Sequence, residues 1–404
     1  MSTSFNVQIA VPFHYEVTFT SDVFNAENPA LALALARREP NKCHRAFFVI
    51  DEGVARAWPR LSEQIQHYAN QHVGTLELAG APVVVPGGEQ VKNDPRHIEA
   101  LHLEIARRGL DRQSFAVIVG GGAVQDMAGF AAATAHRGVR VVRLPTTVLS
   151  QNDSGVGVKN GVNAFGLKNF VGTFAPPFAV LNDARFLETL DRRDRIAGIA
   201  EAVKVSLIRD AEFFDWLTAN ATRLRNLEPQ ATAVMVERSA ELHLRHIESG
   251  GDPFELGSAR PLDFGHWSAH KLESLTAHRL RHGEAVAIGL ALDTLVSVEV
   301  GLLSASIAER VHGVLREIGL PTFHPELEAV DDAGALKVLD GLREFQEHLG
   351  GELTVTLLRG PGQAVDWHDM DPTLIARAIR TLKTGYGSSE PARALPSLVS
   401  GAAE

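Results

Sequence analysis

Long apolar runs, each followed by a loop and a segment of helical periodicity, dominate the first half of the chain. Residues 45–51 and 115–119 are nearly continuous hydrophobic stretches of strand length, and residues 81–86 form a shorter one. Residues 139–144 also have the length of a strand, with two arginines among apolar residues. Such runs are typical of parallel strands buried on both faces of a sheet, whereas strands with one wet face alternate. We therefore predict an α/β domain with a doubly wound, Rossmann-like parallel sheet.

Both ends of the chain depart from this pattern. Residues 5–24 alternate between apolar and polar positions, which predicts short strands. From about residue 195 onward the apolar positions recur with helical periodicity, and no further series of buried strands follows. We therefore expect a mostly helical second domain. The predicted boundaries are residues 1–185 for the α/β domain, 186–384 for the helical domain and 385–404 for a disordered tail.

Composition narrows the class of protein. With 404 residues, 45% hydrophobic and 22% charged, the chain has the composition of a globular protein of two-domain size. The net charge of -10 argues against nucleic acid as a partner, and no apolar run is long enough to cross a membrane. The single cysteine, Cys43, excludes an internal disulfide and fits a reducing compartment, so we expect a cytoplasmic location.

Three of the predicted strands end in residues suited to nucleotide binding. Asp51 closes the first run, Glu89 and Lys92 follow the second, and three glycines at residues 120–122 follow the third. Glycines there let backbone N–H groups approach a pyrophosphate, and the next helix adds its positive N-terminal end. A tight turn is the alternative for one glycine run alone. Three such junctions in a parallel pattern favour a dinucleotide-binding domain over the alternative, a doubly wound fold without that function.

The loop after residues 139–144 is rich in charged groups and glycines. It contains Asp153, Lys159, Lys168 and Asn169. Arg137 lies just before the preceding run. Lysines in a glycine-rich loop suit an anionic ligand, because point charges and backbone N–H groups can surround a phosphate. A solvated surface loop is the alternative.

Two charged residues stand in an otherwise apolar helix. Glu201 and Lys204 are three residues apart in GIAEAVKVSLI, so they share a helix face. A surface ion pair is the usual interpretation, but the apolar neighbours leave little solvated face. Because a buried ion pair is costly, we interpret both as functional residues in a cleft.

Three histidines indicate a metal site in the second half. His266 and His270 are four apart on one predicted helix face, and His282 follows in an Arg-His-Gly-Glu turn. A catalytic metal typically takes three protein ligands and keeps one position open, and Glu201 is our candidate for the remaining ligand. Because the chain has 17 histidines, a chance pair on an amphipathic helix is the alternative.

These segments together resemble a known family. The chain carries, in order, GGEQVK, GGGAVQDMAGFAAATAHRG, PTTVLSQNDSGVGVKNGVNAFGLKN, GIAEAVK, LDFGHWSAH and HGEAVAIG. Their order and spacing resemble the dehydroquinate synthase superfamily of sugar phosphate cyclases over roughly residues 40–365. The resemblance implies an N-terminal NAD-binding α/β domain, a C-terminal helical metal-binding domain and a homodimer.

The resemblance also implies roles for individual residues. Glu201, His266 and His282 match the zinc ligands of the family, with cobalt as an alternative metal, and His270 matches an acid/base residue beside them. The positions that contact the cofactor are matched by Asp51, Glu89, Lys92, Gly120, Gly121, Gly122, Asp126, Thr146, Thr147, Asp153, Lys168, Phe186 and Thr189. Positions that contact the substrate are matched by Lys159, Asn169 and Lys204, and Arg137 matches an arginine that reaches the phosphate across the dimer.

The implied reaction converts a heptulose phosphate into a carbocycle with loss of inorganic phosphate. Transient oxidation of a ring hydroxyl acidifies the adjacent carbon, phosphate leaves, hydride returns, and the opened enol closes by aldol addition. NAD is regenerated in each cycle, and zinc polarises the hydroxyl and later the carbonyl. A metal-dependent polyol dehydrogenase of the same fold is the alternative from another reaction class.

The sequence departs from dehydroquinate synthases where those enzymes hold a substrate carboxylate. Their motif Arg-x-Leu-Leu-Asn is matched by Ala259 at its first position and Asp263 at its last, and a C-terminal lysine pair is replaced by the neighbourhood of residues 346–348. Aspartate repels a carboxylate but accepts hydrogen bonds from hydroxyls. We therefore predict a substrate without a carboxylate. The segments EFQEHLGGELTVTLL and LDFGH resemble the branch of the superfamily that cyclises sedoheptulose 7-phosphate, and this resemblance implies that phosphorylated seven-carbon sugar as the substrate. Activity as a 3-dehydroquinate synthase is the alternative.

Overall fold

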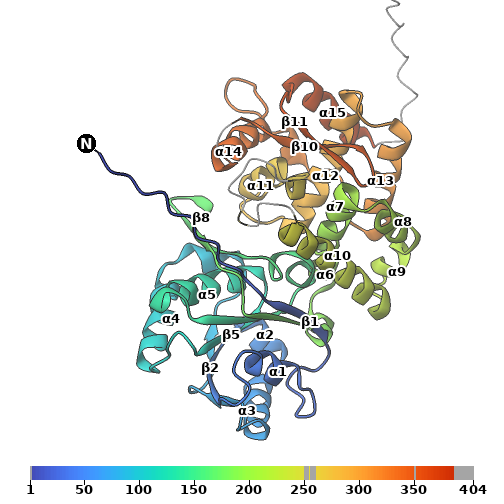
Figure 1. The fold of residues 1–404 in the computed structure, drawn as a ribbon. Coiled ribbons are helices and arrows are strands. Elements are labelled where there is room, and N and C mark those ends of the chain that lie inside the picture. Colours follow the sequence, from blue (N-terminus) through green and yellow to red (C-terminus); the bar gives the residue numbers. More distant parts are fainter. Residues whose placement is uncertain (1, 250–253, 255–260, 350–351, 386–404) are drawn as a thin grey trace, which may run out of the picture. The chain divides into compact units, whose positions relative to one another are not determined.

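The computed structural model describes residues 2–249, 254, 261–349 and 352–385. Within it the chain forms two compact units, Met1–Arg260 and Pro261–Glu404 (Figure 1). The domain boundary predicted near residue 185 stays a prediction. Of the tail predicted at residues 385–404, all but Gly385 lies outside the described residues, as does Ala259.

A seven-stranded sheet forms the centre of the first unit. Its strands lie in the order β1-β9-β6-β5-β2-β3, and β4 also pairs with β2. Every pair in this sheet is parallel, which confirms the predicted α/β fold. The strands are β1 (Glu16–Thr20), β2 (His44–Asp51), β3 (Leu76–Leu78), β4 (Val83–Val85), β5 (Phe115–Gly120), β6 (Arg140–Pro145) and β9 (Ala179–Asp183).

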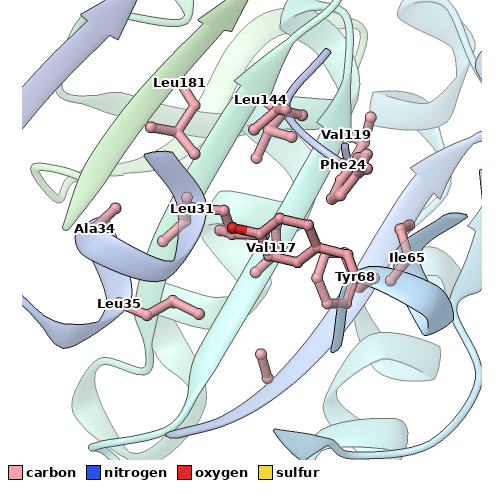
Figure 2. Close-up of a cluster of buried hydrophobic side chains, with 14 of the residues drawn as sticks. Phe24, Leu31, Ala34, Leu35, Ile65, Tyr68, Val117, Val119, Leu144 and Leu181 are labelled. Atoms are coloured by element: carbon pink, nitrogen blue, oxygen red, sulfur yellow. The ribbon is translucent and has the colours of Figure 1, made fainter. Parts of the chain in front are cut away.

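Side chains of the central strands alternate between two hydrophobic cores. In β2, Phe48 and Ile50 belong to one core, and Phe47 and Val49 belong to the other. Helices α1 and α3 cover the first face of the sheet (Figure 2), and α4 and α5 cover the second. Their bounds are α1 (Ala30–Ala36), α3 (Leu61–Gln71), α4 (Arg96–Arg107) and α5 (Gly122–Thr134). Burial on both faces explains the continuous apolar runs in the sequence.

The strand order reverses beside β2. The chain leaves β2 to form β3 and β4 on one side, and it returns to form β5 on the other. In open parallel sheets ligands bind at such a reversal, outside the carboxyl ends of the two strands that flank it. Here those ends are Asp51 and Gly120. Two of the predicted nucleotide-binding residues therefore lie where the topology favours a ligand.

An antiparallel hairpin and several helices complete the first unit. The hairpin consists of β7 (Lys159–Ala164) and β8 (Leu167–Phe174). The helices are α2 (Glu52–Ala57), η1 (Glu89–Asn93), η2 (Ala135–Arg137), η3 (Ser150–Ser154), η4 (Ala184–Thr189), α6 (Arg192–Ala197), α7 (Ile199–Arg209), α8 (Ala211–Ala219), α9 (Ala221–Arg225) and α10 (Pro229–Ser249).

The strands predicted for residues 5–24 form only at β1. Residues 2–15 adopt neither helix nor strand, and Phe5, Val7 and Ile9 are 87%, 74% and 79% exposed. The prediction was wrong there because alternation is a local pattern, whereas a strand also needs a neighbour. Within this segment only β1 has one, in β9.

The second unit is built around helix α12 (His282–Glu299). This helix is buried without interruption from Ala285 to Ser297, as expected for a helix that is apolar all round. Helices α11, α13 and α15 and strand β10 contact it. Within the described residues, no helix combines the length and apolarity needed to span a membrane. The other elements are η5 (Pro261–Asp263), α11 (His266–Leu275), α13 (Ala305–Ile318), η6 (Pro325–Glu328), η7 (Lys337–Leu339), α14 (Asp340–Leu349), β10 (Val355–Gly360), β11 (Gln363–Trp367) and α15 (Pro372–Thr384).

Candidate functional site

The carboxyl ends of β2 and β5 approach each other closely. A Cβ added to Gly120 would lie 3.2 Å from the Cβ of Asp51, and one added to Gly87 would lie 2.5 Å from Asp51 Oδ1. That oxygen accepts a hydrogen bond of 2.7 Å from the backbone N–H of Gly53. Burial raises the pKa of Asp51 although this hydrogen bond opposes the shift. The Asp51 carboxylate, which could accept hydrogen bonds from a ribose, thus lies beside glycine backbone that a pyrophosphate could approach closely.

Glycines at the start of α5 admit the loop that follows β6. A Cβ on Gly121 would lie 3.1 Å from Thr147 Cγ2, and one on Gly122 would lie 2.7 Å from Ser154 Oγ. The N–H of Thr146 donates to the carbonyl of Gly120 at 3.1 Å. Among the described residues, no side chain caps the N-terminus of α5. The structure therefore brings the predicted glycines and threonines together at a helix end that favours anions.

Two further predicted cofactor residues lie on η4. Phe186 packs edge-on against Trp58 with ring centroids 5.8 Å apart, and the Trp58 indole donates to Thr189 Oγ1 at 3.0 Å. Trp58 was not predicted, since a single aromatic residue after a helix carries no signal of its own.

Lys92 is the centre of a polar cluster in the first unit. Its Nζ lies 2.8 Å from Asp126 Oδ2 and 3.7 Å from Glu89 Oε1, and it also donates to Asn169 Oδ1. Burial favours the neutral amine, but Asp126 and Glu89 outweigh it and raise the pKa of Lys92. The structure therefore joins residues that were predicted separately for cofactor and substrate.

Asp153 is the centre of a second cluster. Lys204 Nζ contacts Glu201 Oε2 and lies 4.0 Å from Asp153 Oδ1. His243 on α10 places Nδ1 2.9 Å from the same Asp153 oxygen. Burial alone would raise the pKa of Asp153, but Lys204 and His243 lower it. Glu201 and Lys204 are buried, as the apolar helix predicted. His243 was missed because its partner is distant in sequence.

A buried arginine stabilises the loop between β6 and β7 by hydrogen bonds to its backbone. Arg143 is fully buried in β6, and its guanidinium donates to the carbonyls of Gly155, Gly157 and Lys159 at 2.9–3.1 Å. It also donates to Asn160 Oδ1 at 2.8 Å. One cation therefore fixes the backbone that carries the predicted substrate residues. An arginine inside an apolar strand was a usable signal, because a buried charge needs partners.

The remaining predicted residues of the first unit lie on or beside the hairpin. Lys159 opens β7 and is exposed, and Lys168 and Asn169 lie on β8. Arg137 is exposed on η2 with a positive φ of 61°. Their roles toward a substrate stay predictions.

In the second unit three histidine rings converge. The centroids of His266 and His270 on α11 are 5.4 Å apart, and those of His266 and His282 are 5.5 Å apart. His270 and His282 are 6.0 Å apart. The predicted spacing therefore places the three imidazoles together, with His266 buried and His270 exposed.

The hydrogen bonds of two of these rings suit metal binding. Nδ1 of His266 lies 3.1 Å from the carbonyl of Phe264, and Nδ1 of His282 lies 3.1 Å from Glu273 Oε2. Because both partners are acceptors, the neutral rings carry their protons on Nδ1 and their lone pairs on Nε2. Metal-binding histidines are typically oriented in this way. Glu273 was missed, although it lies only nine residues before His282.

A buried carboxylate fixes the loop on either side of His266. Asp293 Oδ2 accepts from the N–H of Gly265 at 3.0 Å, and Asp293 Oδ1 accepts from the indole Nε1 of Trp267 at 2.8 Å. Burial raises the pKa of Asp293 to about 7. Asp293 was missed because a lone aspartate in an apolar helix has no partner nearby in sequence.

Asp263 lies on η5, three residues before His266. Its Oδ2 is buried and accepts no hydrogen bond from the residues that the structure describes. Such an oxygen is costly unless a ligand donates to it. The Glu201 carboxylate belongs to the first unit, and its place as third metal ligand stays a prediction.

Glycines line the carboxyl ends of the strands at the reversal, and two histidines of the cluster carry their protons on Nδ1, which leaves Nε2 for a metal. These features are typical of a nucleotide-dependent metalloenzyme of the α/β class. The chain belongs to the 3-dehydroquinate synthase family. The model of the N-terminal part of 3-dehydroquinate synthase matches residues 82–197, and that of the C-terminal part matches residues 198–339.

Individual relatives agree with this membership. The chain is 41% identical to a 3-dehydroquinate synthase of Halorhodospira halophila over 78% of this chain and 89% of that protein. It is 32% identical to the 3-dehydroquinate synthase of Shewanella pealeana over 90% of this chain and 96% of that protein. A solved structure of ValA, the 2-epi-5-epi-valiolone synthase of Streptomyces hygroscopicus with NAD+ and Zn2+ bound, superposes with a TM-score of 0.82 at 30% identity, covering 94% of this chain and 99% of ValA. The predicted resemblance to sugar phosphate cyclases is confirmed.

Proposed function

We propose that the chain is an NAD- and zinc-dependent cyclase that converts sedoheptulose 7-phosphate to a carbocycle and releases inorganic phosphate. The family, and the likeness to a valiolone synthase, support the reaction class. The buried Oδ2 of Asp263 supports the choice of substrate. A homodimer and a cytoplasmic location belong to the same proposal.

The carboxyl ends of β2 and β5 form the proposed site of NAD. Asp51 would accept hydrogen bonds from a ribose, and the backbone N–H groups of residues 120–122 would hold the pyrophosphate. Bound there, NAD supplies reversible removal and return of hydride. Asp126 and Glu89 would hold the Lys92 ammonium in place beside it.

The histidine cluster is the proposed metal site. Nε2 of His266 and of His282 and the carboxylate of Glu201 would hold zinc, with cobalt as the alternative. Zinc bound there supplies a Lewis acid for the substrate hydroxyl. His270, close to both rings, would move a proton at that oxygen. The tautomers support the two histidines, and the family resemblance supports Glu201.

Polar residues of the hairpin and of α7 form the proposed substrate site. Lys159, Asn169 and Lys204 would hold the substrate, and Arg137 of a second copy would reach its phosphate. Phosphate departs as an anion, so donors fixed in advance stabilise the charge that develops. Arg143 supports this arrangement because it holds the backbone at Lys159.

Asp263 distinguishes the two heptulose substrates. A carboxylate at the reacting end would face the Asp263 carboxylate, and the repulsion would be strong in a buried site. A neutral hydroxymethyl ketone would instead donate a hydrogen bond to Oδ2, which satisfies a buried acceptor. Asp263 is the observation on which the proposed substrate depends.

The test measures phosphate release and the NMR spectrum of the product for sedoheptulose 7-phosphate and for its carboxylated, 3-deoxy counterpart. We expect turnover of the first and little of the second. Asp263→Asn keeps the shape and removes the charge, so kcat/KM for sedoheptulose 7-phosphate should fall about 10-fold or more, while that for the carboxylated sugar should rise.

The same assay addresses the alternatives. Efficient turnover of the carboxylated sugar by the unaltered enzyme would identify a 3-dehydroquinate synthase, as the names of the relatives at 32–41% identity suggest. Net accumulation of NADH without phosphate release would identify a polyol dehydrogenase. The cyclase regenerates NAD, so it gives phosphate with no lasting absorbance change.

A further inference from the structure

Exposed apolar side chains in the described part of the first unit concentrate on two segments. One is residues 5–13, which we call the arm, and the other is residues 165–174, the tip and second strand of the hairpin. Side chains that are 38–87% exposed lie on both: Phe5, Val7, Ile9, Val11 and Phe13 on the arm, and Phe165, Leu167, Phe170, Val171 and Phe174 on the hairpin. Apolar surface of this extent marks an interaction site rather than ordinary surface.

The arm has the pattern of a strand with one apolar face. Its apolar residues occupy every odd position from Phe5 to Phe13, and this alternation continues into Tyr15 and Val17. Tyr15 and Val17 pack on a small core of the same unit, and the Tyr15 hydroxyl donates to the carbonyl of Val156 at 2.9 Å. The face that is covered at residues 15 and 17 therefore continues uncovered along the arm.

Strand β8 offers a matching edge. Within the described residues β8 pairs only with β7, so its outer edge carries unpaired backbone groups. The nine residues of the arm would span about 30 Å as a strand, and the eight of β8 about 27 Å. Pro12 has no N–H to donate, but it occupies an even position. If the backbone groups of the odd residues pair with β8, those of Pro12 point to the opposite edge of the arm, where no partner is needed.

The arm does not cover the hairpin of its own copy. The ring of Phe254 lies 5.8 Å from that of Phe13, the last residue of the arm, and 5.7 Å from that of Phe174, the last residue of β8. The arm (dark blue in Figure 1) therefore joins the folded unit near the C-terminal end of β8. Beyond that point the arm residues Phe5 and Ile9 remain 87% and 79% exposed. The hairpin residue Phe170 remains 54% exposed.

We propose that the arm of one copy of this chain adds to the β8 edge of a second copy, in a symmetric exchange that forms the dimer. Each copy carries both an arm and an edge, which is the requirement of a two-fold interface. Strand addition supplies backbone hydrogen bonds, and the odd apolar face supplies burial. A stable interface takes about 800 Å² from each partner, and complete burial of an aromatic side chain removes about 150–250 Å². The five phenylalanines of the two segments are 39–87% exposed, so covering their exposed portions supplies a substantial part of that area.

This inference rests on the proposed homodimer and adds the segments that form it. The test measures the mass of the full chain by sedimentation velocity over a range of concentrations, so it does not depend on turnover or on the substrate. We expect dimers at micromolar concentration. Deletion of residues 2–13, or Phe170→Asp, should raise the dissociation constant at least 100-fold. Leu103→Asp, at a 48% exposed position on α4, is the matched control and should leave it unchanged.

Mixing the two variants separates exchange between copies from packing within one copy. The deleted chain keeps an intact edge, and the Phe170→Asp chain keeps an intact arm, so a mixed dimer regains one of the two contacts. We expect the mixture to associate more tightly than either variant alone. A monomeric unaltered chain, a dimer insensitive to both variants, or a mixture no tighter than its components would each overturn the inference. NAD-induced stabilisation of the variants checks that they are folded.

Discussion

At the residue scale, the histidine cluster makes the most direct prediction. His266 donates its Nδ1 proton to the carbonyl of Phe264, which leaves Nε2 available for zinc. His266→Ala removes this ligand, so bound zinc should fall from about one per chain to nearly none. His278→Ala is the matched control, because His278 is exposed on the same segment. Metal content is measured by atomic emission after dialysis. A zinc-replete His266→Ala protein would refute the ligand assignment.

Glu273 supports a second, graded prediction. Its carboxylate holds the His282 ring by Nδ1, and such outer partners typically affect metal affinity by about 10- to 100-fold. Glu273→Gln keeps an acceptor but removes the charge, so zinc should bind more weakly within that range while the fold persists. Competition with a chelator measures the affinity. An unchanged affinity would show that Glu273 only fills space.

Asp293 makes the stability of the second unit depend on pH. Its pKa is about 7 in the folded chain and about 4 in the unfolded one, because burial disfavours the charged form. Between these values the unfolded chain is ionised and the folded one is protonated, so the free energy of unfolding should fall as pH rises from about 4 to about 7. The loss is a few kcal/mol, at about 1.4 kcal/mol per pKa unit.

The variant that tests this is Asp293→Asn, with Asp366→Asn on the exposed surface as control. Urea unfolding with a chelator present, at several pH values, should show a flatter fall for Asp293→Asn than for the unaltered chain or the control. Burial lowers the pKa of His312 to about 4. This residue has the opposite effect, because it decreases the free energy of unfolding as pH drops below about 6.5. It is present in all three proteins, so their difference isolates Asp293. Equal slopes would contradict the prediction.

At the element scale, close packing of α12 against the turn before α11 positions His266. A Cβ on Gly289 would lie 1.9 Å from the carbonyl oxygen of Gly265, which is backbone and cannot rotate away. Gly265 itself has φ of +80°, a conformation that favours glycine. Gly289→Ala should therefore shift the turn, cost about 3 kcal/mol of stability and weaken zinc binding.

Gly313→Ala is the matched control on α13. Apart from its chain neighbours and the nearby backbone of its own helix, no atom of the described residues lies within 4 Å of a Cβ added there. The change should therefore stabilise the chain by about 1 kcal/mol through helix propensity. Urea unfolding and zinc affinity are measured for both variants. If Gly289→Ala behaved like Gly313→Ala, the two helices would not need this approach.

At the scale of the whole molecule, the sequence predicted what depends on local pattern and missed what depends on distant pairs. The parallel sheet was predictable because strands buried on both faces are apolar throughout, and the histidines because their spacing matches one helix turn. Residues 5–15 form no strand within one copy, contrary to the prediction, since alternation says nothing about a neighbour. His243 and Asp293 were missed because their partners lie 26 to 90 residues away, as in the His243–Asp153 pair. Arg143 was missed although a charged residue inside an apolar strand is a usable signal.

The division into two units makes a final prediction about where each ligand acts. The carboxyl ends of β2 and β5 belong to the first unit, and the three histidine rings belong to the second. In hydrogen exchange of the full chain, NAD alone should slow amides at residues 51–54 and 118–126, and zinc alone should slow those at residues 264–284. His266→Ala should lose the zinc pattern and keep the NAD pattern. Protection of α7 by zinc would identify Glu201 as the third ligand. If NAD instead protected residues 264–284 and had no effect at residues 118–126, the cofactor would bind outside the proposed site.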